Sequence, residues 1–205
     1  MQRVGLMGGS FNPIHCGHLN MARAALNAGA AGRVLILPSG NPPHKRAGLA
    51  DKMDRLAMAE LAIADQPGME ICREEIDREG VIYTVDTLDI LAERMPDAKL
   101  IYLIGADTLA VLHTWRRIDE VIRKCAFQVA MRPGEDEAQI QAAAESWRSR
   151  GAQIDFLPSP LMEISSTEIR RRLEQGLALD GLVPAAVEDY IRRHQLYASD
   201  GDDNR

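Results

Sequence analysis

Short apolar segments alternate with longer helical patterns along the chain, and this alternation constrains the fold more than any other feature. The clearest apolar segment is 99–104, Lys-Leu-Ile-Tyr-Leu-Ile, a run typical of a strand buried on both faces. Further strands are expected at 3–7, 33–38, 69–73, 126–131 and 153–157, and helices at 19–26, 51–64, 84–95, 135–150 and after Ser165 and Pro184. The pattern predicts an α/β fold, a Rossmann-like doubly wound parallel sheet with helices on both faces and a small C-terminal helical segment.

The composition is that of one compact domain. With 205 residues, of which 46% are hydrophobic, the chain can bury a single sizeable core. We expect residues 1–197 to form one domain and the polar tail 198–205 to be disordered. The sequence leaves the oligomeric state open, a homo-oligomer included.

Charge and cysteine content exclude several classes of protein. A net charge of -6 argues against general binding of nucleic acid. Three cysteines without paired spacing indicate reduced thiols. We see no signal segment and no apolar run near the ~20 residues of a membrane helix. We therefore expect a cytoplasmic protein that does not bind membranes.

Residues 8–18, Gly-Gly-Ser-Phe-Asn-Pro-Ile-His-Cys-Gly-His, lie between the first expected strand and the first expected helix. Glycines at such a turn let the backbone approach a phosphate closely, and the first N–H groups of the helix favour an anion. His15 and His18 are three positions apart, so both rings can face one phosphate. The segment predicts a nucleotide phosphate site.

This segment has two alternative interpretations. A tight turn without a ligand would explain Gly8 and Gly9, since short glycine patterns arise by accident. Zinc binding by His15, Cys16 and His18 fits the residue types, but no second cluster of cysteine or histidine completes a ligand set. The pair of histidines favours the phosphate site, and we assign no metal ligand in the protein.

A second candidate phosphate site lies at the expected helix start after Ser165. Ser165 and Glu168 have the spacing of a capping box, so a structural role explains both residues. The same helix start offers N–H groups to a phosphate, and Arg170 adds a forked cation. The two roles are compatible. Arg171 and Arg172 are expected on a solvated helix face.

The motifs and their order resemble those of the HxGH nucleotidyltransferase superfamily, whose members transfer AMP or CMP from a nucleoside triphosphate. Residues 8–18 and 164–170 resemble its two phosphate motifs, and 105–107, Gly-Ala-Asp, resemble its ribose-contacting strand end. The segments 41–45 and 83–88, together with Trp115, are similar to those of bacterial nicotinate-nucleotide adenylyltransferases. The similarity runs from about Arg3 to Tyr197. Ser10 and Asn12 depart from the threonine and aspartate of many members but keep hydrogen-bonding capacity.

This resemblance implies transfer of AMP from ATP to nicotinate mononucleotide, which gives nicotinate adenine dinucleotide (deamido-NAD) and pyrophosphate. It implies catalytic roles for His15, His18 and Lys45, with Mg²⁺ carried by ATP. ATP would contact Gly8, Gly9, Ser10, Phe11, Gly105, Asp107, Ser165, Ser166, Thr167 and Arg170. Nicotinate mononucleotide would contact His44, Lys45, Thr84, Val85 and Trp115. Because the attacking 5′-phosphate is already ionised, alignment and charge stabilisation suffice, without a protein nucleophile.

Alternatives remain at single residues and for the whole chain. His44 and Lys45 could belong to a solvated charged loop, and Trp115 could be an ordinary core residue. A phosphopantetheine adenylyltransferase would share the histidine motif and the Ser-Ser-Thr helix start, but 42–45 and Trp115 favour the pyridine-nucleotide enzymes. A synthetase fragment would need a lysine-rich second motif. A non-catalytic nucleotide sensor would have no need of the histidines, Lys45 and Arg170 together.

Overall fold

The computed structural model describes residues 1–40, 48–158 and 162–198 of the chain. In this part the chain forms a parallel sheet with the strand order β3-β2-β1-β4-β5-β6. Its strands are β1 (Gln2–Gly9), β2 (Arg33–Pro38), β3 (Met69–Ile71), β4 (Ala98–Gly105), β5 (Ala126–Ala130) and β6 (Ile154–Phe156). The chain starts at the centre, winds to one edge, returns and winds to the other, which confirms the predicted doubly wound fold.

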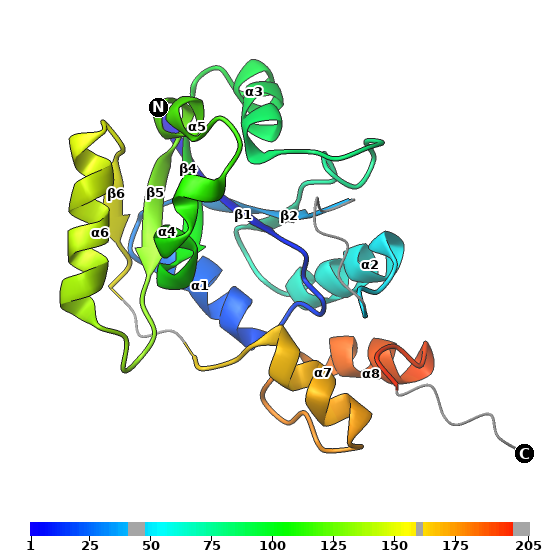
Figure 1. Cartoon of the computed structure of the whole chain (residues 1–205). Coiled ribbons are helices and arrows are strands. Elements are labelled where there is room, and N and C mark those ends of the chain that lie inside the picture. Colours follow the sequence, from blue (N-terminus) through cyan, green and yellow to red (C-terminus); the bar gives the residue numbers. More distant parts are fainter. Residues whose placement is uncertain (41–47, 159–161, 199–205) are drawn as a thin grey trace, which may run out of the picture.

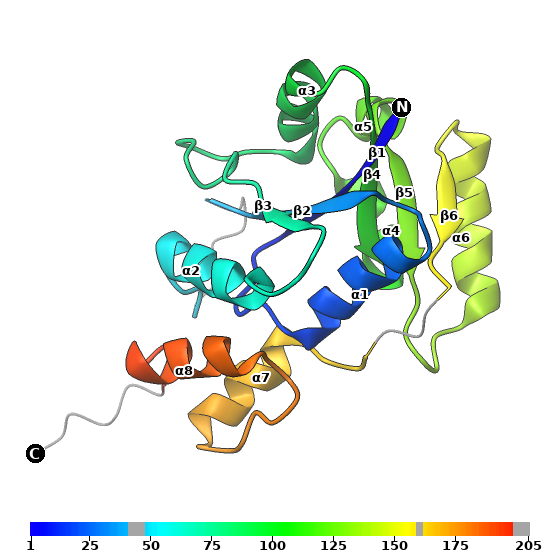
Figure 2. The same ribbon diagram turned by 180° about the vertical axis from the view of Figure 1, so that it is seen from behind.

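Helices cover both faces of the sheet (Figures 1 and 2). One face carries α1 (Cys16–Asn27) and α2 (Lys52–Ile63), and the other carries α3 (Thr84–Arg94), α5 (Ile118–Lys124) and α6 (Glu137–Ser149). The short α4 (Ala106–Ala110) and the 3₁₀ turn η1 (Leu112–Thr114) follow β4, and α7 (Ser166–Glu174) and α8 (Ala185–Arg193) form the predicted C-terminal helical segment. No described helix is both long and apolar enough to cross a membrane.

The side chains of the central strands alternate between two hydrophobic clusters. In β4, Leu100, Tyr102 and Ile104 face α3, α5 and α6, while Ile101 and Leu103 face α1 and α2. Both sets are buried, which explains why the sequence of this strand is a continuous apolar run. Full burial of one such aliphatic side chain contributes roughly 1.5–3 kcal/mol.

Two local expectations were wrong. Gly8 and Gly9 are the last residues of β1, paired with Leu37 and Pro38 of β2, rather than a turn after the strand. Residues 106–124, for which we predicted no helix bounds, form the three short helices α4, η1 and α5, because Trp115 is extended and Arg117 has a φ of 54°. Tertiary packing, not local periodicity, sets these breaks.

The second correction concerns the start of α7. Ser165 caps the helix as expected, since its hydroxyl accepts the Glu168 N–H at 3.2 Å. The Glu168 carboxylate, however, accepts from Arg171 and Arg172 at 2.7 and 2.9 Å. These two charge-assisted contacts replace the return contact of a capping box. Arg171 and Arg172 therefore lie on the helix surface as predicted, but paired with Glu168.

One buried cation holds the loops at the carboxyl ends of β1 and β2. Arg55 of α2 is 1% exposed, and its guanidinium donates to the carbonyl oxygens of Ser10 at 2.7 Å, Gly40 at 2.9 Å and Ala50 at 3.1 Å. Burial lowers the pKa of Arg55 from its ordinary value. A charge at this depth is tolerated because backbone acceptors surround it.

The C-terminal helices are tied back to the first loop. The Tyr197 hydroxyl donates to Asn12 Oδ1 at 2.7 Å, and the Asn12 amide donates to the Gly48 carbonyl at 2.9 Å. On α8, the Tyr190 hydroxyl donates to Asp54 of α2 at 2.9 Å. These contacts support the proposal that residues 1–197 form one domain, while 199–205 lie outside the described residues.

Candidate active site

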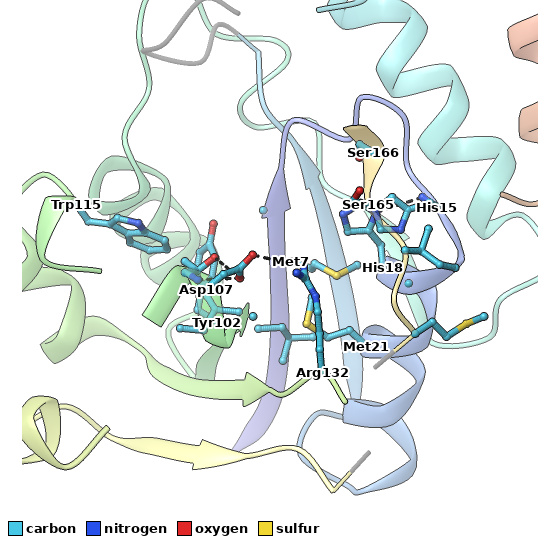
Figure 3. A pocket seen from close by; sticks show the side chains of 18 residues that line it. Met7, His15, His18, Met21, Tyr102, Asp107, Trp115, Arg132, Ser165 and Ser166 are labelled. Atoms are coloured by element: carbon cyan, nitrogen blue, oxygen red, sulfur yellow. Dashed lines mark hydrogen bonds and ion pairs between the residues drawn. The ribbon is translucent and has the colours of Figure 1, made fainter. Parts of the chain in front are cut away.

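A cavity of about 370 Å³ lies over the carboxyl ends of β1 and β4, between the starts of α1 and α7. This is the position at which open sheets of this type bind ligands. We call it the first cavity. Figure 3 shows histidines on one side, Asp107 and Trp115 on the other, and Arg132 between them. Its polar and glycine lining consists of Gly8, His15, Gly17, His18, Tyr102, Gly105, Asp107, Thr108, Trp115, Arg132, Ser165 and Ser166.

His15 and His18 form a stacked pair at the start of α1. Their ring centroids are 3.6 Å apart with an angle of 23° between the planes. The backbone N–H of His15 donates to His18 Nδ1 at 3.2 Å. A nitrogen that accepts this bond carries no proton, so neutral His18 holds its proton on Nε2. Phe11 packs edge-on against His18, with centroids 5.0 Å apart.

Both histidines are neutral at pH 7 in the protein without substrate. Burial, and secondarily the charge of Arg132, lowers the pKa of His15 to about 4. Burial also lowers the pKa of His18 well below its ordinary value, with smaller contributions from His15 and Arg132. The pair can therefore donate hydrogen bonds to an anion without carrying a fixed charge.

Arg132 supplies the positive charge of the first cavity. It lies two residues after the end of β5, and its guanidinium reaches Asp107 Oδ2 on α4 at 3.4 Å. The side chain of Arg132 is 40% exposed, so this ion pair is screened by water and holds the cation weakly. An incoming phosphate can replace Asp107 as its partner.

A second cavity, of about 470 Å³, adjoins the first across Gly8, Tyr102 and Trp115, which line both. The wall of this second cavity is continued by Gly9, Ser10, Ser39, Gly40, Glu75, Ile82, Tyr83, Thr84, Thr114 and Arg116. A Cβ atom at Gly8 would lie 2.1 Å from the Tyr102 hydroxyl oxygen. Glycine at position 8 lets the backbone of β1 lie close to the Tyr102 hydroxyl, and any larger residue would require one of the two to move.

Aromatic rings and one buried acid shape the second cavity. Trp115 packs edge-on against Tyr102 and Phe127, with centroids 5.4 and 6.4 Å away. Glu75 is buried, and its Oε1 accepts the Thr87 hydroxyl at 3.0 Å. Burial raises the pKa of Glu75 to about 7, although Thr87 and Arg78 oppose the rise. Burial likewise raises the pKa of Tyr102, and Glu75 adds to the shift.

The structure gathers most of the residues predicted for ATP, but it divides them between the two cavities. Ser165 and Ser166 line the first cavity with Gly8, Gly105 and Asp107. Gly9 and Ser10 line the second cavity. Thr167 lines neither, and Phe11 is buried behind His18 at 2% exposure.

Arg170 also lies away from the lining of the first cavity. Its guanidinium donates to the carbonyl oxygen of Asn12 at 2.7 Å and reaches Thr167 Oγ1 at 3.4 Å. In this position Arg170 braces the loop before the histidines. Direct contact with a phosphate would require it to leave Asn12.

Of the residues predicted for nicotinate mononucleotide, Thr84 and Trp115 line the second cavity. The Val85 side chain is fully buried in the core, so any contact from Val85 would come from its backbone. Its N–H belongs to the first turn of α3, ahead of the hydrogen-bond ladder of the helix. His44 and Lys45 lie outside the described residues.

Sequence reasoning missed Arg132, Tyr102, Glu75 and Arg116. Arg132 had a usable signal, because it follows an expected strand at the ligand-binding edge of the sheet. Glu75 had none, since it stands in a charged stretch whose other members are mostly solvated. Its burial is a consequence of tertiary packing alone.

The strand order and the adjoining cavities at the sheet centre define a Rossmann-like α/β protein with room for ligands at the carboxyl ends of its strands. Comparison with known proteins narrows this class. Residues 6–172 match the family model described as cytidylyltransferase-like.

Two curated relatives, each named "Probable nicotinate-nucleotide adenylyltransferase", come from Neisseria meningitidis serogroup C and Moorella thermoacetica. They are 42% and 41% identical to the chain, over 96% and 95% of its length and 99% and 91% of their own. A solved structure titled Plasmodium falciparum nicotinic acid mononucleotide adenylyltransferase complexed with NaAD matches with a TM-score of 0.79. Its identity is 18% over 96% of this chain and 98% of that one, a likeness of fold. The chain belongs to the cytidylyltransferase-like family and, within it, to the nicotinate-nucleotide adenylyltransferases.

The buried Glu75 predicts a pH dependence of stability. The folded protein keeps this proton up to about pH 7, whereas the unfolded chain releases it near the ordinary value of 4.5. The folded state then binds more protons in this interval, so the Glu75 contribution to stability falls as pH rises through it. In the wild type this contribution lowers the free energy of unfolding by on the order of 1–3 kcal/mol as the pH rises, and Glu75→Gln should remove that decrease.

Urea denaturation of the wild type and Glu75→Gln at pH 5 and pH 8 measures this change. The histidines shift stability in the opposite direction, because their folded pKa values are lowered. That contribution is common to both proteins and cancels in the difference between them. Equal pH dependence of the two free energies of unfolding would contradict the assignment.

Proposed function

We propose that this protein transfers AMP from ATP to nicotinate mononucleotide and so makes nicotinate adenine dinucleotide and pyrophosphate, a step of NAD biosynthesis. The observation that carries the proposal is 42% identity to a nicotinate-nucleotide adenylyltransferase across 96% of the chain. Two adjoining cavities that share Gly8, Tyr102 and Trp115 support a reaction between two bound substrates. Both cavities lie on the one sheet.

We assign the triphosphate to the first cavity. Its lining contains the histidine pair, the cation Arg132 and the starts of two helices, α1 and α7. Helix N-termini and a forked guanidinium are complementary to phosphate oxygens. Gly105, the last residue of β4, and Asp107, in the first turn of α4, are proposed to meet the ribose of ATP.

We assign nicotinate mononucleotide to the second cavity. The Trp115 ring is held by Tyr102 and Phe127 and offers a face for stacking on the pyridine. The N–H groups of Thr84 and Val85, in the first turn of α3, are proposed to meet the ring carboxylate. The shared wall at Gly8 then brings the 5′-phosphate towards ATP.

The reaction requires alignment more than acid–base chemistry. An oxygen of the mononucleotide 5′-phosphate forms a bond to the α-phosphorus of ATP, and the bond from that phosphorus to the oxygen bridging to the β-phosphate breaks. Pyrophosphate leaves with this electron pair. Neutral His18, with its proton on Nε2, is suited to donate a hydrogen bond to charge that develops at the α-phosphate.

The remaining assignments are proposals on the resemblance. Lys45 is proposed as a catalytic cation and His44 as a contact of nicotinate mononucleotide. Thr167, Arg170 and Phe11 are proposed to act on ATP through the geometry of the first cavity. Mg²⁺ is proposed to arrive with ATP. Within the described residues no group of three His, Cys, Asp or Glu side chains could hold a metal ion, so we assign Mg²⁺ no protein ligand.

The substrate assay tests the function directly. With ATP present, pyrophosphate release should occur with nicotinate mononucleotide and fall about a hundredfold in kcat/KM with the amide mononucleotide. The carboxylate accepts bonds from the N–H groups at the start of α3, whereas the amide NH₂ opposes one of them. Phosphopantetheine is the control acceptor. Activity with phosphopantetheine alone would contradict the proposal.

The histidine assignment predicts a large loss of turnover in His18→Ala. Removal of one donor to developing charge costs on the order of 10²-fold or more in kcat. His194→Ala is the matched control, because His194 ends α8 and lines neither cavity. Circular dichroism establishes that both variants fold. Near-normal kcat in folded His18→Ala would remove His18 from the mechanism.

The proposed roles of Arg132 and Arg170 in ATP binding can be tested by replacing each residue with alanine. Arg132→Ala should raise the KM for ATP roughly 10- to 100-fold, because a charge-assisted contact is lost, and change the KM for nicotinate mononucleotide less. Arg170→Ala should also raise the KM for ATP, and it should lower the free energy of unfolding by roughly 1–3 kcal/mol, because the Asn12 carbonyl loses its partner. Steady-state kinetics and urea denaturation separate the two effects. An unchanged KM for ATP in Arg132→Ala would refute its role.

A further inference from the structure

The charged side chains around the second cavity determine how it can bind a carboxylate. Among the described residues, Glu75 and Arg116 are the charged side chains that line it. Glu75 has a pKa of about 7 because it is buried, so it is partly ionised at neutral pH. A second carboxylate that enters this cavity meets a fractional negative charge, and it needs a cation to offset the repulsion.

Arg116 is placed to supply that cation. It follows the proposed stacking residue Trp115 directly, and its guanidinium carbon lies 4.7 Å from the centroid of the Tyr83 ring. Tyr83 is the N-cap residue of α3. The guanidinium therefore lies beside the helix start whose N–H groups are proposed to receive the nicotinate carboxylate.

The next residue, Arg117, differs from Arg116 in its surroundings. Its guanidinium donates to Glu120 at 2.8 Å through Nε and lies 3.8 Å from Asp86, and it does not line the second cavity. Arg116 has no such carboxylate partner within the part of the chain that the structure describes. Two adjacent arginines thus differ: one is neutralised at the surface, and the other faces the cavity over an aromatic ring.

We infer that Arg116 is a specificity-determining residue, whose guanidinium binds the ring carboxylate of nicotinate mononucleotide and so favours the acid over the amide. This inference rests on the proposed function and names the side chain that reads the charge. The ring of Tyr83 keeps the guanidinium at the mouth of the cavity without consuming its forked N–H donors. A carboxylate can accept two of these donors at once, whereas a carboxamide offers one neutral oxygen.

The experiment compares Arg116→Gln with the matched control Arg117→Gln. For each variant and the wild type, kcat and KM are measured with the acid and the amide mononucleotides at saturating ATP. Arg116→Gln should lower kcat/KM for the acid about tenfold, through KM, and leave the amide within about twofold. Arg117→Gln should leave both substrates within about twofold, because surface ion pairs contribute little.

Two further measurements separate charge recognition from a structural role. Raising the salt concentration from 0.05 to 0.5 M shortens the Debye length to below about 10 Å. This change should lower kcat/KM for the acid mononucleotide more in the wild type than in Arg116→Gln. Arg116→Lys, which restores the charge without the fork, should recover part of the preference for the acid. A merely structural role would change both substrates together and would show no such recovery.

The outcomes that overturn the inference are distinct from failure of the function. Absence of AMP transfer to either mononucleotide by the wild type would refute the proposed function and this inference with it. An active Arg116→Gln enzyme with an unchanged acid-to-amide ratio of kcat/KM would refute the role of Arg116 alone. An equal change of that ratio in Arg117→Gln would also refute it, since a general effect of surface charge would then suffice.

Discussion

The buried guanidinium of Arg55 is the interaction on which the geometry of the site depends. It joins the carbonyls of Ser10, after β1, and Gly40, after β2, to helix α2. Ser10 and Gly40 both line the second cavity, so one cation fixes two edges of that cavity from behind. Loop backbone at a sheet edge is costly to order, and charge-assisted bonds to a buried arginine offset that cost.

The hydrogen-bond donors of the site are of two kinds, neutral histidines and positively charged arginines. Burial keeps His15 and His18 neutral, while the cations lie towards the cavities, with Arg132 at the first and Arg116 at the second. Substrates that carry phosphates and carboxylates then meet charges that are loosely held by Asp107 or by the Tyr83 ring. Such cations change partner at little cost, whereas the histidines, fixed by stacking, keep their positions.

Some parts of the site could be predicted because their signals are local. The spacing of His15 and His18 around a helix start, and the serine cap at Ser165, are readable without a fold. Arg170 has the right chemistry in the sequence, yet the structure sets it on the Asn12 carbonyl. Arg132 has a local signal in its place after a strand, but its pairing with Asp107 and its effect on the pKa of His15 depend on the fold, and the burial of Glu75 beside Thr87 has no local signal.

The strand and helix pattern, and hence the doubly wound sheet, can be predicted from the amino-acid sequence, because apolar periodicity records which faces are buried. The sequence also determined the family, since the motifs retain their order along the chain. Only the folded chain shows that two cavities share a wall at Gly8, that burial lowers the pKa of both histidines, and that Arg116 rather than Arg117 lines the second cavity. Distances between residues far apart in the chain, and the burial that shifts a pKa, exist only after the strands have paired.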